Sequence, residues 1–116
     1  MHRVIRILSS VLVVAALAAP ASAQETTGTI TGRVTDTSGG VLPGVTVTIT
    51  NTRTGQSLNR VTSAEGTYTA PLLPPGEYEV QFELSGFQTR VVRGIRLSVN
   101  DRLTVDIELS VSGLTE

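Results

Sequence analysis

The 116-residue sequence contains no cysteine and no tryptophan, and its one histidine is His2. Without cysteine no disulfide can form, so the fold has to be held by its core alone. Zinc sites and most nucleophilic triads need imidazole or thiolate groups, and the chain beyond His2 has neither. The sequence therefore argues against zinc-dependent hydrolysis, and we expect a protein that is not an enzyme and that carries no cofactor.

Lysine is also absent, so all nine basic residues are arginines. Two of them, Arg3 and Arg6, stand at the very start, whereas all ten acidic residues come later. Residues 24–116 thus combine seven basic with ten acidic residues, a net charge of −3. Because this charge offers no basic field for phosphates, we expect no nucleic acid partner.

The first 23 residues have the features of a secretory signal peptide. A short basic start, "MHRVIR", precedes the apolar run "ILSSVLVVAALAA", and "PASA" then places Ala21 and Ala23 at an A-x-A cleavage site. A transmembrane helix is the alternative, but it needs about 20 apolar residues, and this run is shorter and is closed by Pro20. We predict that residues 1–23 direct export and that residues 24–116 form one domain beginning at Gln24.

Beyond residue 23 apolar and polar side chains alternate with period two, the pattern of strands with one buried face. Five segments show it clearly, and their apolar residues are Ile30, Gly32 and Val34; Val45, Val47 and Ile49; Tyr68, Ala70 and Leu72; Tyr78, Val80, Phe82 and Leu84; and Leu103, Val105, Ile107, Leu109 and Val111. Two weaker strands lie at Leu58–Thr62 and in "RVVRGIRLSV", where a slip of phase at Gly94 predicts a bulge. With short turn-rich segments between them and no helical stripe, these strands predict an all-β, seven-stranded antiparallel sandwich.

One corner is marked strongly by "LPPG". Pro74 and Pro75 lack N–H groups and fix φ, and Gly76 can adopt the positive φ that a tight turn often requires. We therefore predict that these three residues form a structural turn that sets the register of the strand after it.

Five blocks in order between Gly28 and Leu109 carry a family resemblance, and the longest are "GTITGRVTDTSGGVLPGVTVTITN" and "LLPPGEYEVQFELSGF". The matching residues are Gly32, Val34 and Asp36; Leu42, Pro43, Gly44 and Val45; Gly66 and Tyr68; Leu73, Pro74, Gly76 and Tyr78; and Gly86 and Phe87. Together they resemble the carboxypeptidase regulatory-like domain, a transthyretin-like sandwich of the broader Ig-like class. The resemblance implies a module without peptidase activity. The collagen-adhesin repeats share this sandwich class, and some are locked by a lysine–asparagine isopeptide bond, which cannot form here because lysine is absent.

The resemblance also implies a context, because Oar-like TonB-dependent outer-membrane receptors often begin with a signal peptide followed by this module. We therefore expect an exported spacer or docking module in the periplasm or outer membrane of a Gram-negative bacterium. Its partners would be a receptor barrel and periplasmic proteins, and the chain would be a fragment of a longer receptor. The alternative is a free secreted carbohydrate-binding or adhesive module. Phe87, in the "SGFQ" turn, is the one aromatic residue that the strand phase leaves outside for a sugar to stack on.

Two sets of oxygen donors are candidates for chemical sites. Asp36, Asn100 and Asp101 lie in or beside turns, but their spacing matches no calcium loop, and turn capping is the simpler interpretation. Asp106 and Glu108 alternate with apolar residues on a strand, so we expect a solvated face rather than a catalytic carboxylate pair. The sequence thus predicts no catalytic and no metal site.

Overall fold

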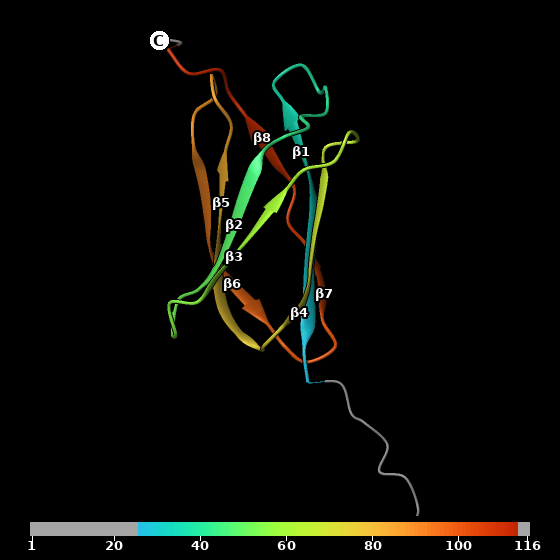
Figure 1. The fold of residues 1–116 in the computed structure, drawn as a ribbon, viewed down its shortest axis with the longest axis vertical. Coiled ribbons are helices and arrows are strands. Elements are labelled where there is room, and N and C mark those ends of the chain that lie inside the picture. Colours follow the sequence, from blue (N-terminus) through green and yellow to red (C-terminus); the bar gives the residue numbers. More distant parts are fainter. Residues whose placement is uncertain (1–25, 114–116) are drawn as a thin grey trace, which may run out of the picture.

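The computed structural model describes residues 26–113, which form two facing β-sheets (Figure 1). In the first sheet β1 (Gly28–Asp36) pairs with β4 (Thr67–Leu73), β7 (Arg102–Thr104) and β8 (Ile107–Leu109). The second sheet has the order β3 (Ser57–Val61), β2 (Thr46–Asn51), β5 (Gly76–Glu83) and β6 (Arg90–Leu97). The predicted all-β sandwich is confirmed. The predicted signal peptide, residues 1–23, lies outside the described residues.

The core lies between the two sheets and is built from the apolar positions of the alternating strands. Tyr68 and Phe82 meet edge to face across it, with ring centroids 5.7 Å apart. The buried apolar residues are Ile30, Val34, Leu42, Val45, Val47, Ile49, Tyr68, Ala70, Leu73, Tyr78, Val80, Phe82, Ile95, Leu97 and Leu109. Because both sheets contribute to this one cluster, their burial holds the sandwich together without any covalent link.

The sequence predicts an antiparallel sandwich, but two of the strand pairs are parallel. β1 runs parallel to β7 and β8, whereas the pairs β1–β4, β2–β3, β2–β5 and β5–β6 are antiparallel. Since the first and last strands point the same way, the described chain enters the sandwich at one pole and leaves it at the opposite pole (Figure 1).

The last predicted strand is divided, which gives eight strands in place of seven. Between β7 and β8 the carbonyl oxygen of Val105 turns toward β1 and accepts a hydrogen bond from the Tyr68 hydroxyl at 2.6 Å. Gly32 permits this approach, because a Cβ atom there would lie 1.9 Å from the same oxygen. Val111, predicted to be on the inward face, is 46% exposed because it lies beyond the end of β8.

A second correction concerns the end of β4. Leu72 was expected to face inward with Tyr68 and Ala70, yet it is 77% exposed, and Leu73 is buried instead. The β1–β4 register shifts between the pairs Gly28–Leu73 and Ile30–Ala70, so β4 contains one extra residue. This bulge turns Leu72 outward and leaves it with φ 59°, in the left-handed region that leucine rarely adopts.

The bulge predicted at Gly94 is present. The β5–β6 register shifts between the pairs Tyr78–Ile95 and Val80–Val92, so Arg93 and Gly94 together oppose a single residue of β5. Gly94 has φ 73°, which glycine adopts at little cost. The slip of phase in the sequence therefore corresponds to a real bulge on an edge strand.

Candidate functional site

The predicted corner lies between β4 and β5. Pro74 and Pro75 are the two residues between these strands, and Gly76 is the first residue of β5. Gly76 has a positive φ of 157°, which residues with a side chain rarely adopt, and Leu72 nearby also has a positive φ, 59°. The Tyr78 hydroxyl donates a hydrogen bond to the Pro74 carbonyl oxygen at 2.5 Å and ties the corner to β5. This hydrogen bond is consistent with the structural turn that we predict, and Pro74, Pro75 and Gly76 carry no reactive side chain.

The aromatic residues give little surface for a sugar ring. Tyr68, Tyr78 and Phe82 are 3%, 2% and 0% exposed, as expected from strand phase. Phe87 is half-buried, packs against the core and is bridged to Val111 by backbone pairing. Among residues 26–113 no aromatic ring therefore stands free on a flat face, the arrangement that pyranose binding usually needs.

The turn carboxylates cap backbone and side-chain groups of their own turns. Asp36 Oδ1 accepts hydrogen bonds from Ser38 Oγ at 2.6 Å and from the backbone N–H groups of Ser38 and Gly40. The Ser38 hydroxyl is the main reason that the pKa of Asp36 lies below its ordinary value. Asp101 Oδ2 accepts from the Ser98 N–H at 2.8 Å. No group of three metal-binding side chains occurs in the described part of the chain.

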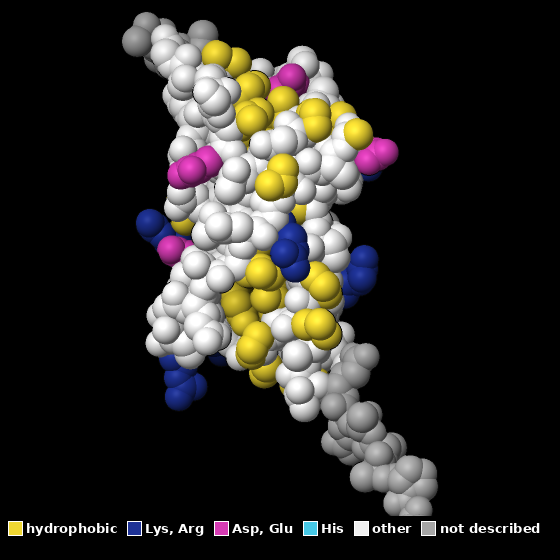
Figure 2. Space-filling model, viewed as in Figure 1, with side chains coloured by type: hydrophobic (Ala, Val, Ile, Leu, Met, Phe, Trp, Pro, Cys, Tyr) yellow, Lys and Arg dark blue, Asp and Glu magenta, His cyan; other side chains and the backbone are white. Residues whose placement is uncertain are grey.

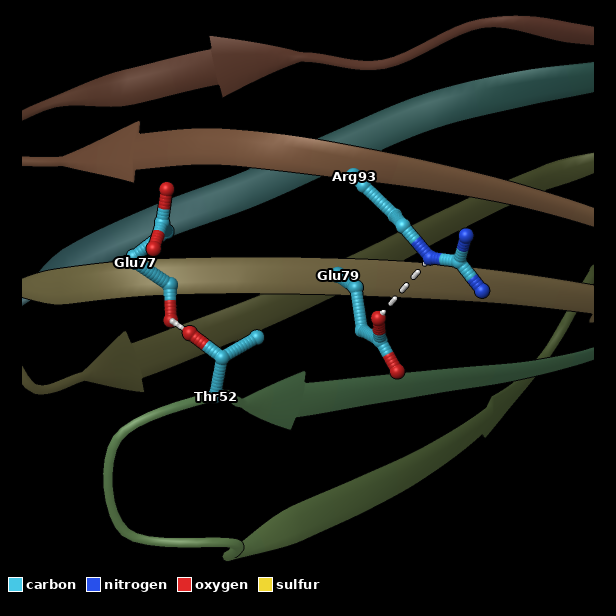
Figure 3. A network of polar contacts seen from close by, with 4 residues as sticks. All are labelled: Thr52, Glu77, Glu79 and Arg93. Carbon is cyan, nitrogen blue, oxygen red and sulfur yellow. Dashed lines mark hydrogen bonds and ion pairs between the residues drawn. The ribbon is translucent and has the colours of Figure 1, made fainter.

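Two acids on or beside the strands, Asp106 and Glu79, have structural partners. Asp106 Oδ1 accepts a hydrogen bond from the Arg33 N–H at 2.8 Å, which bridges β1 to the break between β7 and β8. On the outer face of the second sheet Glu79 points toward Arg93, with Oε2 and Nε 3.4 Å apart, and the neighbouring Glu77 carbonyl oxygen accepts from Thr52 (Figure 3). An exposed ion pair of this kind contributes ~0–1 kcal/mol to stability. These acids show no arrangement for acid–base catalysis.

The tyrosine hydroxyls do not offer reactive groups either. Burial, with a smaller contribution from the negative charge of Asp106, raises the pKa of Tyr68 far above its ordinary value. The neutral hydroxyl is thereby kept as the donor to Val105. Tyr68 is thus a buried residue whose hydrogen bond links β4 to the segment between β7 and β8.

The surface feature that sequence reasoning missed is a groove between β3 and β4. Its volume is about 340 Å³, and its walls come from both sheets. Its principal lining residues are Leu58, Arg60, Pro71, Leu72, Pro74 and Tyr78. One signal was available in the sequence, because Pro71, Leu72 and Leu73 are consecutive apolar residues and cannot all face one side of a regular strand.

No segment within residues 26–113 forms a helix long and apolar enough to span a membrane.

The chain resembles known proteins in sequence and in fold. It is 34% identical over its whole length to the TonB-dependent transporter Oar of Myxococcus xanthus, of which it spans 11%. In fold it is similar to a catechol 1,2-dioxygenase of Acinetobacter radioresistens, with a TM-score of 0.61, 13% identity, and coverage of 78% of this chain and 53% of that one. The pilus 2b backbone protein of group B streptococcus has a TM-score of 0.58 at 19% identity, with coverage of 74% and 42% respectively. At these identities the structural likeness shows the fold alone.

The family model for the carboxypeptidase regulatory-like domain matches residues 29–110, which include all the strands of the two sheets except the first residue of β1. The match confirms the resemblance carried by the glycine, proline and tyrosine positions of the sequence. The chain belongs to the carboxypeptidase regulatory-like domain family.

Proposed function

We propose that this chain is the exported, non-catalytic module at the N-terminal end of a TonB-dependent outer-membrane receptor. The observation that carries the proposal is its 34% identity, over its full length, to one part of the transporter Oar. Two carboxylates and both tyrosines support the non-catalytic part, because Asp36, Asp106, Tyr68 and Tyr78 each make a structural hydrogen bond. The predicted signal peptide at residues 1–23 is consistent with export.

In that position the sandwich acts as an in-line spacer in the periplasm. The parallel pairing of β1 with β7 and β8 supports this role, because the chain then enters and leaves at opposite poles (Figure 1). A nine-residue strand such as β1 is about 30 Å long, so one module would separate its neighbours by roughly that length. The partners of such a spacer are the receptor barrel beyond it and proteins of the periplasm.

The alternative, a free secreted carbohydrate-binding or adhesive module, has less support. It depends on Phe87, and this side chain is half-buried against the core.

Fractionation of the source bacterium tests the receptor proposal. An antibody raised against the purified chain would be used on immunoblots of outer-membrane, periplasmic and culture-medium fractions. We expect it to detect a polypeptide several times longer than 116 residues in the outer-membrane fraction. A strain in which the gene is deleted is the control for antibody specificity. Detection of a product no longer than 116 residues in the culture medium would instead support the secreted module.

A further inference from the structure

We propose that the groove between β3 and β4 binds an extended segment of another polypeptide as an added strand. The segment would carry one aliphatic and one acidic side chain, two residues apart, on the face turned toward the groove. This inference goes beyond the receptor proposal and does not depend on it.

The groove forms where two consecutive strands separate into different sheets. β3 and β4 are joined by a turn over residues 62–66, in which the Ser63 N–H donates to the Thr67 carbonyl at 2.9 Å. Arg60 Nε still reaches the Thr69 carbonyl at 3.2 Å, but beyond this contact the strands diverge (Figure 1). The space between them is hollow and surrounded by apolar side chains low on the face seen in Figure 2.

One rim of the groove has backbone groups that do not pair with β2. Hydrogen bonds from Thr62 N to Val45 O and from Asn51 N to Gln56 O flank the β2–β3 ladder. The backbone N–H and C=O groups of successive residues point to opposite sides of a strand. Since residues 56 and 62 both bond to β2, the even-numbered residues of β3 between them also bond to β2. The peptide groups of Ser57, Asn59 and Val61 therefore point away from the sheet, as a strand needs for pairing with an added chain.

The other sheet edges in the described chain are protected against strand addition. β6 has the bulge at Gly94 and three arginines, β4 contains Pro71 and its own bulge, and β7 and β8 are three residues each. β3, with sequence SLNRV, has no proline, no glycine and no bulge. An incoming strand would therefore pair with β3.

The apolar walls of the groove determine the chemical type of one side chain of the partner. Leu58 faces the groove from β3, and Pro71, Leu72 and Pro74 face it from the other rim. Leu72 is 77% exposed and has φ 59°, so a strained backbone holds an apolar side chain in water at the mouth of the groove. An aliphatic side chain placed between these walls would remove their apolar surface from water.

Arg60 determines the chemical type of the partner's other side chain. It is the charged residue in the groove lining, and it makes no ion pair with any described residue. Its guanidinium donates instead to the Asn59 and Thr69 carbonyls, each at 3.2 Å. A partner carboxylate would compete for this guanidinium and release the Asn59 carbonyl for the incoming strand.

The spacing follows from strand geometry. Leu58 and Arg60 are two residues apart and line the same groove, so the residues opposite them on an added strand are also two apart. The aliphatic residue then lies near Leu58 and the acidic residue near Arg60.

Fluorescence anisotropy with the full chain tests the proposal. The probe is the peptide Ser-Thr-Leu-Thr-Glu-Thr-Ser-amide with fluorescein on its N-terminal amine, and its partner peptide has Gln in place of Glu. We expect the Glu peptide to bind about 5-fold more tightly than the Gln peptide, and Arg60→Gln to reduce that ratio to about 1. Leu72→Asp should weaken binding of the Glu peptide at least about 10-fold, because it places a like charge at an apolar wall.

Two variants serve as controls for charge and for backbone pairing. Val41→Asp makes the same change of charge at an exposed valine outside the groove lining and should leave binding unchanged. Asn59→Pro removes an outward N–H without disturbing the β2 ladder and should abolish binding while thermal unfolding stays cooperative.

Three results would overturn the proposal. The first is the absence of binding at peptide concentrations up to about 1 mM. The second is binding that Leu72→Asp and Asn59→Pro leave intact while circular dichroism shows both variants folded. The third is a dimer in sedimentation that Asn59→Pro dissociates, because a second copy would then be the occupant of this edge.

Discussion

At the scale of single residues, Gly32 shows how a missing side chain decides the path of a distant strand. The carbonyl oxygen of Val105 occupies the place where a Cβ atom of residue 32 would lie, at 1.9 Å. Because the obstacle is backbone and is hydrogen-bonded to the Tyr68 hydroxyl, it cannot move aside without disturbing that hydrogen bond.

We therefore expect Gly32→Ala to destabilise the domain by at least ~3 kcal/mol, through the clash and the lost pairing of β7. Gly39→Ala is the matched control, since Gly39 has φ 87° but open space around it, and it should cost only ~1–2 kcal/mol. Urea unfolding of both variants measures the difference. Equal costs for the two substitutions would mean that the close approach at Val105 is wrong.

Asp36 provides a prediction about pH. Its folded pKa lies below 3.8, mainly because the Ser38 hydroxyl donates to the carboxylate. A depressed pKa means that the stability it contributes is fully present above the unfolded value and is lost as the pH falls through the folded value. In an NMR titration the Asp36 side-chain midpoint should lie below 3.8 and should move up toward it in Ser38→Ala. A midpoint unaffected by this substitution would contradict the assigned cause.

At the scale of elements, the end of β4 combines two neighbouring leucines with opposite roles. Leu73 is buried in the core, whereas Leu72 lies outside with a left-handed backbone. Asparagine tolerates that conformation better than leucine does, so Leu72→Asn should leave stability unchanged or raise it by up to ~1 kcal/mol. Leu73→Ala should cost ~2–5 kcal/mol through the cavity it leaves. Thermal and urea unfolding measure both effects, and a larger loss for Leu72→Asn would restore the inward assignment of Leu72.

Alternation of side chains was enough to predict the strands and most of the core, because each strand has one buried face. It failed at Leu72, since Pro71, Leu72 and Leu73 are all apolar and the bulge that selects Leu73 depends on pairing with β1. It also missed the break after Thr104, because Val105 and Ile107 continue the alternation while the backbone turns toward Gly32. The groove could not be predicted, since it depends on how far β3 and β4 diverge after a shared turn.

At the scale of the whole molecule, buried aromatic residues separate the two functional interpretations. Tyr68, Tyr78 and Phe82 belong to the core, and Phe87 covers part of it. A protein of residues 24–116 should therefore not be retained on immobilised glucans, chitin or peptidoglycan at concentrations that retain binders of micromolar to low-millimolar affinity. Affinity electrophoresis measures this retention. Retention that Phe87→Ala abolishes without loss of stability would favour the carbohydrate-binding module.

The first and last strands run parallel, so the chain enters and leaves the domain at opposite poles, and this arrangement supports the spacer role that we propose. In a receptor the two poles would face different neighbours, while the flank with the β3–β4 groove would remain open to proteins of the periplasm. An in-line spacer with a side-facing groove can hold a partner close to the receptor without taking part in transport chemistry.

The central claim is that the domain lies on the periplasmic side of the outer membrane, and cysteine labelling tests it most directly. The natural sequence has no cysteine, so Arg53→Cys, in an exposed turn, introduces a single thiol into this domain. Cells of the source bacterium are treated with a maleimide attached to a polyethylene glycol chain too large for porins, and the unsubstituted strain is the control. The periplasmic assignment predicts no labelling at this position in intact cells and full labelling after the outer membrane is permeabilised. Equal labelling before and after permeabilisation, or a labelled product in the culture medium, would contradict it.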